Sequence, residues 1–477
     1  MPATTTAAAR ATPDALTIAC ERGLACAERG DFAGAATAYA AAIRIAPRLV
    51  ALHRLRLDAL VQAGDRVAGG IAARAILPLL RDVSADEAQQ LGRAALDAGA
   101  ADVAVRCFEG ARRLAPHAAA AHAALAAALR ATGELARAER AVQQALALAP
   151  DDATALHTAA HIAHDRGDMA AALAGFDRAI ARRPGHDAAL VHRGHVRALL
   201  GDLAGGFADM EHRPLPTPLL PCPAWHGEPL AQRSVLVVAE QGAGDTLMAV
   251  RWLPLLHAAG AGAVTLVAPL ALHRLLRANG IAVVAPDEPV RADVHVPLLS
   301  IPHRLALAGE AIPRAASWPY LHVPATAHDI VRDGSPAMRA PATPLRIGLA
   351  WQGNPAHRND HHRSLDRTTL HALLRGARGL PIEWVVLQQG AAAHDAPASL
   401  ARIVVTVDTG LAHLAGALGV RTWMLVPFVA DWRWGMHGSE TPWYPSLQLV
   451  RQSAPRDWRA PLATLHAALR DRARAHA

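Results

Sequence analysis

Two short turns in the second half of the chain combine glycine with aspartate. The first, Gly242-Ala243-Gly244-Asp245-Thr246, follows the apolar run at 235–238, and the second, Asp408-Thr409-Gly410, follows the apolar run at 403–407. Glycine lets a backbone approach a ligand closely, and a helix start offers N–H groups and a positive dipole end to an anion. The turns are therefore candidate phosphate sites, and their plainer interpretation is two well-capped helices.

The densest polar cluster of the chain is HRNDHHRS at 357–364. Its arginines, Arg358 and Arg363, could neutralise a leaving diphosphate, and Asn359 and Asp360 could orient the hydroxyl groups of a ligand. Three histidines beside Asp360 also suggest a metal site. These ligands are bunched in one loop without spaced partners elsewhere, so a metal site is disfavoured. A solvated polar loop is the plainer alternative.

Aromatic residues gather near the C-terminus of a chain that contains only 4% of them. The stretches DWRWG at 431–435 and PWYP at 442–445 contain Trp432, Trp434, Trp443 and Tyr444. Such rings could stack on a base or a sugar. Packing in a core or a closing lid is the alternative for each ring taken singly.

Strands and helices are expected to alternate through the second half of the chain, as in a doubly wound parallel sheet. We predict strands at 235–238, 264–267, 281–284, 346–350, 383–387, 403–407 and 422–426, with helices at 246–258, 271–278, 368–378 and 460–475. The pattern restarts after a proline-rich stretch near residue 342, which predicts two Rossmann-like halves. Ligands of such sheets bind beyond the carboxyl ends of the strands, where both glycine turns fall.

The first half of the chain is an array of repeats. Glycines recur at residues 30, 64, 99, 133, 167 and 201, and prolines at 47, 116, 150, 184 and 218, with Arg81 where one proline is missing. A period of 34 residues with these marks is typical of tetratricopeptide repeats, least regular here at 65–115. The predicted domains are a solenoid of about six 34-residue units at 15–212, an extended linker at 213–233, and two halves at 234–335 and 342–477. The concave face of such a solenoid is expected to bind a protein or peptide, or else to scaffold the second half.

Composition excludes several classes of function. The 477 residues are 52% hydrophobic and 19% charged, and all 48 basic residues are arginine. A lysine nucleophile, a Schiff base and a Walker-A lysine are therefore excluded. The arginines are scattered despite a net charge of +7, so we expect no nucleic-acid partner. Four cysteines without a CxxC pair, and no signal peptide or apolar run of about 18 residues, predict a cytoplasmic protein without a transmembrane segment.

The region 225–460 resembles a known family through several motifs in order. These are AEQGAGDTLMAVRWLPLL, RADVHVPLLSIPHRL, RIGLAWQGNPAHRNDHHRSL, VTVDTGLAHLAGALGVRTWMLVPFVADWRWG and PWYPSLQLVRQ. They are similar to the glycosyltransferase-like domain of bacterial tetratricopeptide-repeat proteins, itself similar to the ADP-heptose heptosyltransferases of glycosyltransferase family 9, with a GT-B fold. The layout is more distantly similar to the O-linked N-acetylglucosamine transferases.

This resemblance implies an inverting transfer of a sugar from a nucleotide-diphosphate donor to a hydroxyl group, without a metal or cofactor. It implies that Asp245, after Gly242 and Gly244, is the base and that Asp408 contacts the donor sugar. The remaining positions that it assigns to the donor site are Thr409, Gly410 and Leu411 at the phosphates, His413 facing the same pocket, and Gln388 near the nucleotide.

One departure from the family leaves alternatives open. Only 19 residues, 389–407, separate Gln388 from Asp408, where the family has another strand and helix. The donor-binding half is therefore expected to lack one β-α unit. A non-catalytic interaction scaffold with a degenerate GT-B domain is the alternative function, and a GT-B sugar epimerase is a third.

Overall fold

The computed structural model describes residues 6–215, 222–323, 344–353, 360–388 and 403–476. Within these ranges the side chains of residues 6–14, 361 and 362 are not described. The chain forms two compact units, Met1–Ala189 and Leu190–Ala477. The division falls inside helix α11 (Asp187–Leu199), so most of the sixth predicted repeat belongs to the second unit.

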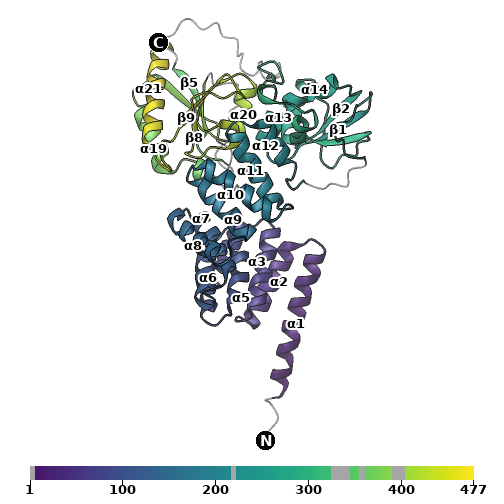
Figure 1. The fold of residues 1–477 in the computed structure, drawn as a ribbon, viewed down its shortest axis with the longest axis vertical. Helices are drawn as coiled ribbons and strands as arrows, with labels where there is room; N and C mark the ends of the chain where they lie inside the picture. The colour runs from purple at the N-terminus through teal and green to yellow at the C-terminus, as the bar shows by residue number, and fades with distance from the viewer. Residues whose placement is uncertain (1–5, 216–221, 324–343, 354–359, 389–402, 477) are drawn as a thin grey trace. The chain divides into compact units, whose positions relative to one another are not determined.

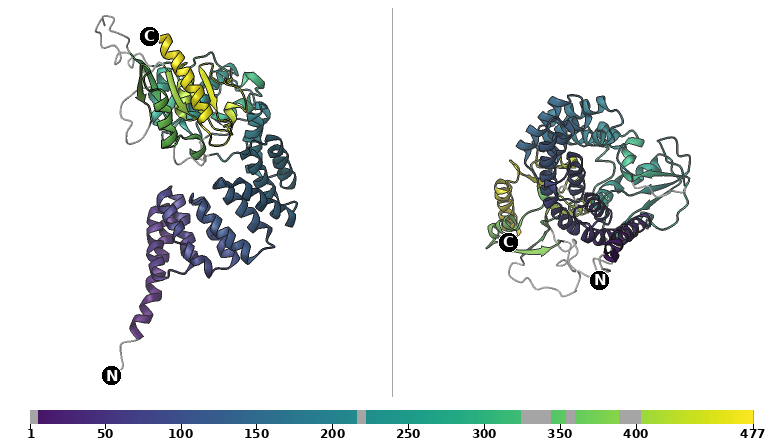
Figure 2. Two further views of the ribbon diagram at one scale, coloured as in Figure 1. Left: turned by 90° about the vertical axis from the view of Figure 1, so that its left-hand side faces the viewer. Right: turned by 90° about the horizontal axis from the view of Figure 1, so that it is seen from below.

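The first unit consists of helices that pack against their neighbours in sequence (Figure 1). They are α1 (Thr6–Glu28), α2 (Phe32–Ile45), α3 (Val50–Gln62), α4 (Arg66–Arg74), α5 (Ala85–Asp97), α6 (Ala101–Leu114), α7 (Ala119–Ala131), α8 (Leu135–Leu148), α9 (Ala153–Asp165) and α10 (Met169–Arg182). The repeat array predicted from the sequence is confirmed. Figure 2 shows these helices stacked in succession.

The recurring Gly-Asp pair explains how each repeat turns. Gly30, Gly64 and Gly167 have φ angles of 76°, 71° and 83°, which favour glycine, and each ends a first helix. The following aspartate caps the second helix, as Asp31 does by accepting from Gly34 N at 2.8 Å. Where the proline is replaced by Arg81, α4 is shorter and a 3-10 turn at Leu77–Arg81 follows it.

Small residues let the paired helices approach. A Cβ atom placed on Gly23 would lie 2.5 Å from a ring atom of Tyr39, and one on Gly92 would lie 2.6 Å from Phe108. Both aromatic rings are buried. Each ring therefore fills the space that a glycine leaves on the facing helix, which is how an alanine-rich array builds a packed core.

The second unit begins with α11 and α12 (Leu203–Met210) and continues into a four-stranded parallel sheet in the order β3-β2-β1-β4. Its elements are β1 (Ser234–Val238), α13 (Ala243–Ala249), α14 (Leu253–Ala258), β2 (Ala263–Val267), α15 (Leu270–Ala278), β3 (Val283–Val284), β4 (Val294–Pro297) and α16 (Ile301–Arg304). The register pairs Val235 with Val264 and with Val294. The helix predicted at 246–258 is broken by a 3-10 turn, Val250–Trp252, ahead of Pro254, which has no N–H group to donate.

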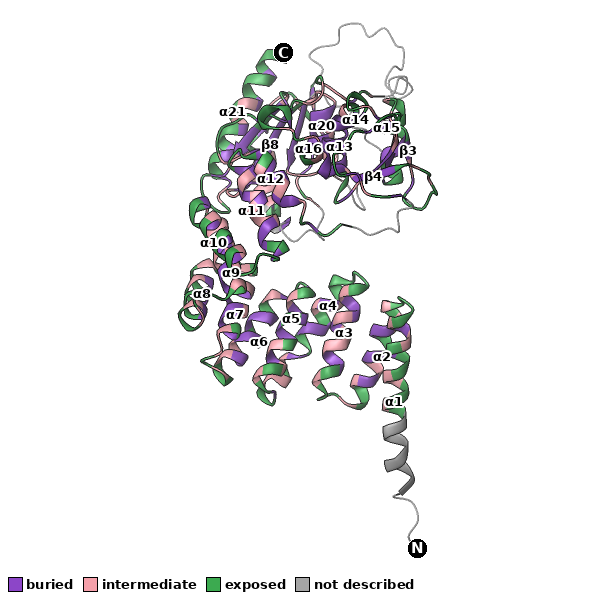
Figure 3. Ribbon diagram, turned by 45° about the vertical axis from the view of Figure 1, so that its right-hand side comes forward, coloured by how far each residue is buried: buried purple, intermediate pink, exposed green. Residues whose placement is uncertain are grey.

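A second parallel sheet follows, in the order β6-β5-β7-β8-β9. Its elements are β5 (Leu345–Leu349), α18 (Asp360–Arg363), α19 (Arg367–Gly376), β6 (Ile382–Val386), β7 (Ile403–Val407), α20 (Gly410–Ala417), β8 (Arg421–Val426), β9 (Leu447–Arg451) and α21 (Arg459–His476). The two parallel sheets predicted from the sequence are confirmed, whereas β4 and β9 were not predicted. Figure 3 shows the central strands as buried.

The order of the second sheet bears on its length. A common doubly wound order is 3-2-1-4-5-6, and the described strands match positions 2-1-4-5-6. No strand of the described residues occupies position 3, and residues 389–402, which connect β6 to β7, lie outside the described ranges. None of the described helices combines the length and apolar character needed to cross a membrane.

Candidate functional site

The two glycine turns meet. Helix α13 starts after β1 and α20 starts after β7, so both begin at the carboxyl ends of parallel strands. A Cβ atom placed on Gly244 would lie 2.8 Å from Cδ2 of His413 and 3.1 Å from Cα of Gly410. The structure therefore brings the two halves of the second unit into direct contact at the turns, and only glycine fits at 244 without displacing a neighbour.

Asp245 uses both carboxylate oxygens. Its Oδ2 accepts a hydrogen bond from Gly242 N at 2.9 Å, which caps α13, and its Oδ1 accepts one from Arg433. Arg433 lies in the loop after β8, so this ion pair joins the first half to the second. The family resemblance implies that Asp245 is a base; in this arrangement its proton-accepting atoms are already hydrogen-bonded.

Arg433 is the centre of a cluster of charges. It donates to Asp431 Oδ1 at 2.7 Å and lies 4.2 Å from the ring centroid of Trp432. Burial opposes its charge, but attraction to Asp431, Asp245 and Asp408 raises the pKa of its guanidinium above the usual value. Its Nε is buried and has no hydrogen-bond partner among the described residues.

Two aspartates beside Arg433 have pKa values driven apart. Burial and then the negative charge of Asp431 raise the pKa of Asp408 to about 6, against the opposing effect of Arg363 and Arg433. Burial would also raise the pKa of Asp431, but the charge and hydrogen bonds of Arg433 lower it below the usual value. A carboxyl pair with one member ionised and one titrating near neutral pH is suited to acid–base chemistry.

His413 is held by the core. Its ring is buried, its Nδ1 lies 2.9 Å from the hydroxyl of Tyr444, and it stacks on Trp434 with centroids 5.2 Å apart. Burial, and then the charge of Arg433, lower its pKa to about 3, so it is neutral at pH 7. The plain interpretation, a hydrogen-bonded core histidine, describes this residue better than a ligand-binding role.

The other predicted phosphate contacts lie at the start of α20. Thr409 precedes its first turn, and the Thr409 hydroxyl lies 3.3 Å from that of Thr406. Gly410 is exposed and Leu411 is half-buried. Gly242 is likewise exposed at the start of α13, so both helix starts are open to solvent at these residues.

Only part of the polar cluster at 357–364 can be placed. Arg358 and Asn359 lie outside the described residues. Asp360 is buried, and Arg363 Nε donates to its Oδ1 at 3.3 Å. The charge of Arg363 reaches the second glycine turn, where it lowers the pKa of Asp408. Arg363 therefore belongs to the charge cluster.

Gln388 connects the ends of two strands. Its Oε1 accepts from Trp351 N at 3.1 Å and Gln352 N at 3.0 Å, and its Nε2 donates to Gln352 O at 3.0 Å. These contacts fix the chain after β5 and β6. A structural role therefore accounts for its position.

The four aromatic residues for which ligand stacking and core packing were both open are packed inside the protein. Trp432, Trp434, Trp443 and Tyr444 are all buried. Trp443 also covers Arg251, whose guanidinium lies 5.3 Å from its ring and 4.9 Å from that of Tyr444. Arg251 donates to the backbone oxygens of Pro313 and Trp443, so the core alternative is correct for these rings.

Sequence reasoning missed Asp431, Arg433 and Arg251. The first two lie within DWRWG, in which only the tryptophans were considered as candidate ligand contacts. An aspartate and an arginine two residues apart in that motif were the sequence feature that could have indicated an ion pair. A small cavity also adjoins Arg433, lined by His195, Phe207, Met210, Arg213, Gln241, Leu299 and Trp432. The sequence gives no sign of this cavity, because its lining comes from separate segments of the chain.

Comparisons with known proteins concern the repeats. Residues 3–49 and 90–153 match the family model described as a tetratricopeptide repeat. No curated protein matches the chain. Solved structures that match include the MamA protein, at 21% identity over 36% of this chain and 93% of that one, with a TM-score of 0.29.

Two further matches are tetratricopeptide-repeat proteins. YrrB, described as having an unusual peptide-binding site, is 17% identical over 36% of this chain and 88% of its own, with a TM-score of 0.28. A thermophilic protein of Thermus thermophilus is 19% identical over 38% and 97%, with a TM-score of 0.28. On the family match and the observed helical pairs, the N-terminal part of the chain carries tetratricopeptide repeats, which are protein-interaction modules.

Proposed function

We propose that the second unit transfers a sugar from a nucleotide-diphosphate donor to a hydroxyl group, and that the repeats bind the protein or peptide that presents the acceptor. One observation carries this proposal. The start of α20, at the carboxyl end of β7, lies among two arginines, Arg363 and Arg433, and two aspartates whose pKa values diverge. Divergent carboxyl groups at such a position are typical of functional sites.

These groups suit the departure of a nucleoside diphosphate. The first turn of α20 offers backbone N–H groups and a positive dipole end to the phosphates at Thr409, Gly410 and Leu411. Arg363 and Arg433 supply positive charge where negative charge develops on the leaving group. The transfer then needs no bound metal, in keeping with the resemblance to glycosyltransferase family 9.

The base is proposed to be one of two aspartates. Asp245, the residue suggested by the resemblance, must exchange its contact with Arg433 before it can accept a proton. Asp408, with a pKa of about 6, is ionised for most of the time at pH 7 to 8 and is close to the operating pH. Asp408 is therefore the stronger candidate, and Asp245 positions Arg433.

Nucleotide titration tests the proposal. ADP, UDP and GDP are added to the full chain and binding is followed by calorimetry, with Arg363→Gln as a charge-removing variant. We expect one of the three to bind and the variant to bind it about tenfold or more weakly. Failure of all three at millimolar concentration would overturn the enzyme proposal.

Activity measurements then show which of the two aspartates, Asp408 or Asp245, is the base. Release of nucleotide from the matching nucleotide-sugar is measured for Asp408→Asn and Asp245→Asn. If Asp408 is the base, Asp408→Asn loses activity while still binding nucleotide. The activity of the wild type should also fall below about pH 6, and the residual activity of the variant should not show this fall. The reverse ranking of the two variants would return the role to Asp245.

A non-catalytic interaction scaffold is the second candidate. Protein groups already fill the junction between the two halves of the second unit, which favours this function. Gly244 lies against Gly410, and Arg433 forms an ion pair with Asp245. The rings of DWRWG and PWYP are buried. Under this proposal the repeats bind a partner and the second unit is a folded support. Binding of a protein partner with no binding of any nucleotide would establish it.

A further inference from the structure

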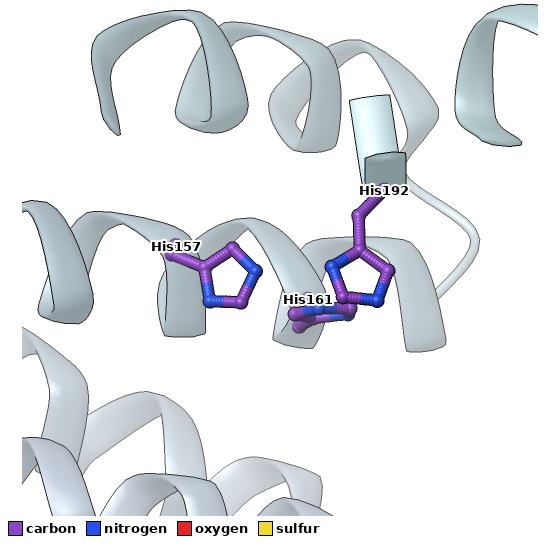
Figure 4. Close-up of side chains that lie close together, drawn as sticks. All are labelled: His157, His161 and His192. Carbon is purple, nitrogen blue, oxygen red and sulfur yellow. The ribbon is translucent and has the colours of Figure 1, made fainter. Parts of the chain in front are cut away.

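Helix α9 in the repeat array carries two histidines one turn apart. His157 and His161 have ring centroids 4.7 Å apart at 85°, and one ring nitrogen of each lies within 4.8 Å of the other (Figure 4). Residues four apart share one face of a helix, which is the spacing that helical zinc sites use. His192, also drawn in Figure 4, belongs to α11 in the second unit.

The orientation of the His157 ring is set by a backbone contact. The ring forms a hydrogen bond with the backbone of Ala188. A backbone contact of this kind is the usual one that orients a metal-binding imidazole.

A second observation comes from the neighbouring His186. Its ring centroid lies 4.8 Å from that of His157, and the residue is 8% exposed. Its Nε2 is buried without a hydrogen-bond partner among the described residues. Buried polar atoms are nearly always satisfied, so an unpartnered ring nitrogen beside a histidine pair indicates a missing group. A hydrated cation on His157 would bring water to this nitrogen.

We propose that His157 and His161 bind a divalent transition-metal ion of the zinc class, with His186 bonded to its hydration water. Imidazole is a preferred ligand of Zn²⁺, Cu²⁺ and Ni²⁺. With Zn–N bonds of about 2.1 Å the two nitrogens must lie no more than about 4.2 Å apart, which small side-chain rotations achieve. Two protein ligands leave positions open for water or for a carboxylate or imidazole of a bound partner.

The charges around His157 and His161 determine how tightly a metal ion is expected to bind. Arg130 and Arg183, which disfavour a proton on His157, also oppose a metal cation, although Arg130 is paired with Asp165 at 2.7 Å. His164, on the same helix, lies 3.2 Å from Asp165. We therefore expect the pair to bind the metal ion more weakly than a closed four-ligand zinc site does.

Competition for Zn²⁺ with a chromophoric chelator tests the site in the full chain. We expect one Zn²⁺ per chain, with affinity lowered about tenfold or more by His157→Ala and by His161→Ala. His164→Ala is the matched control, because it removes a histidine of the same helix outside the pair, and it should keep wild-type affinity. Circular dichroism checks that each variant retains its helices, and His161→Gln serves if the alanine variant does not.

Two results would overturn the proposal. One is a double variant, His157→Ala with His161→Ala, that binds Zn²⁺ as the wild type does, since the metal then sits elsewhere among the 26 histidines of the chain. The other is an equal loss of affinity in His164→Ala, which would indicate diffuse binding to surface histidines.

Discussion

Asp408 and Asp431 are two carboxyl groups beside Arg433 whose pKa values depart from the usual value in opposite directions. Burial and the charge of Asp431 raise the pKa of Asp408, whereas the charge and hydrogen bonds of Arg433 lower the pKa of Asp431. The folded-state pKa of Asp408 is about 6, above its usual 3.8, so the folded protein binds more protons than the unfolded chain between these values. The stabilising contribution of its protonated form is present below about pH 4 and is lost as the pH rises through 6.

Asp408→Asn is therefore expected to raise the free energy of unfolding above pH 6 and to change it little at pH 4. The uncharged amide removes both the burial cost and the repulsion from Asp431, a gain of about 1–3 kcal/mol at pH 8. Urea unfolding at the two pH values measures the difference. An equal effect at both would show that charge is not the cause.

Arg433 is expected to be the most sensitive residue of the cluster. Arg433→Ala leaves the carboxylates of Asp245 and Asp431 without their cation. The loss is about 3–5 kcal/mol for a fully buried pair, and we expect a smaller loss here because the side chain of Asp431 is 36% exposed. Urea unfolding at pH 7 gives the loss. Arg459→Ala is the control, because Arg459 is exposed and pairs only at the surface with Asp457, and its unfolding curve should match the wild type. A similar loss in both variants would contradict a special role for Arg433.

At the scale of elements, helices α13 and α20 meet at two glycines, Gly244 and Gly410, which differ in how much space surrounds them. A Cβ on Gly244 would lie 2.8 Å from His413, whose ring is held by Tyr444 and Trp434. A Cβ on Gly410 would find nothing closer than Gly244 N at 3.5 Å, an ordinary contact.

Gly244→Ala is thus expected to destabilise the second unit by about 1–3 kcal/mol, while Gly410→Ala changes stability by less than about 1 kcal/mol. Thermal unfolding of the two variants side by side is the measurement. If Gly410→Ala proves the more harmful, the helices pack differently from the structure.

Helices whose turns and caps are formed by neighbouring residues could be predicted from the sequence. Strands and ion pairs that depend on residues far away in the sequence could not. The repeats were predictable because Gly30 and Asp31 set a turn and a cap within a few residues. The short strands β4 and β9 carry no such local signal and exist through pairing with β1 and β8. Asp245 and Arg433 are 188 residues apart, so no local pattern could reveal their ion pair.

At the scale of the whole molecule, the second unit includes helix α12 as part of its core. Phe207 on α12 is buried, with its ring 5.6 Å from Trp252 of the first half and 5.5 Å from Trp432 of the second. Just beyond α12, Arg213 donates to both oxygens of Glu240, and this pair is buried. A helix with a repeat-like sequence thus contacts both sheet-bearing halves.

Phe207→Ala is therefore expected to loosen the sheets and not the array that precedes them. Truncation of a buried phenylalanine costs about 3–5 kcal/mol, so hydrogen exchange should quicken in β1 and β8 and stay unchanged in α9 and α10. Phe176→Ala, a fully buried phenylalanine on α10, is the matched variant and should give the converse pattern. If Phe207→Ala instead quickens exchange in α9 and α10 alone, α12 is energetically part of the repeat array, and the boundary lies after the sixth repeat, as the sequence period suggests.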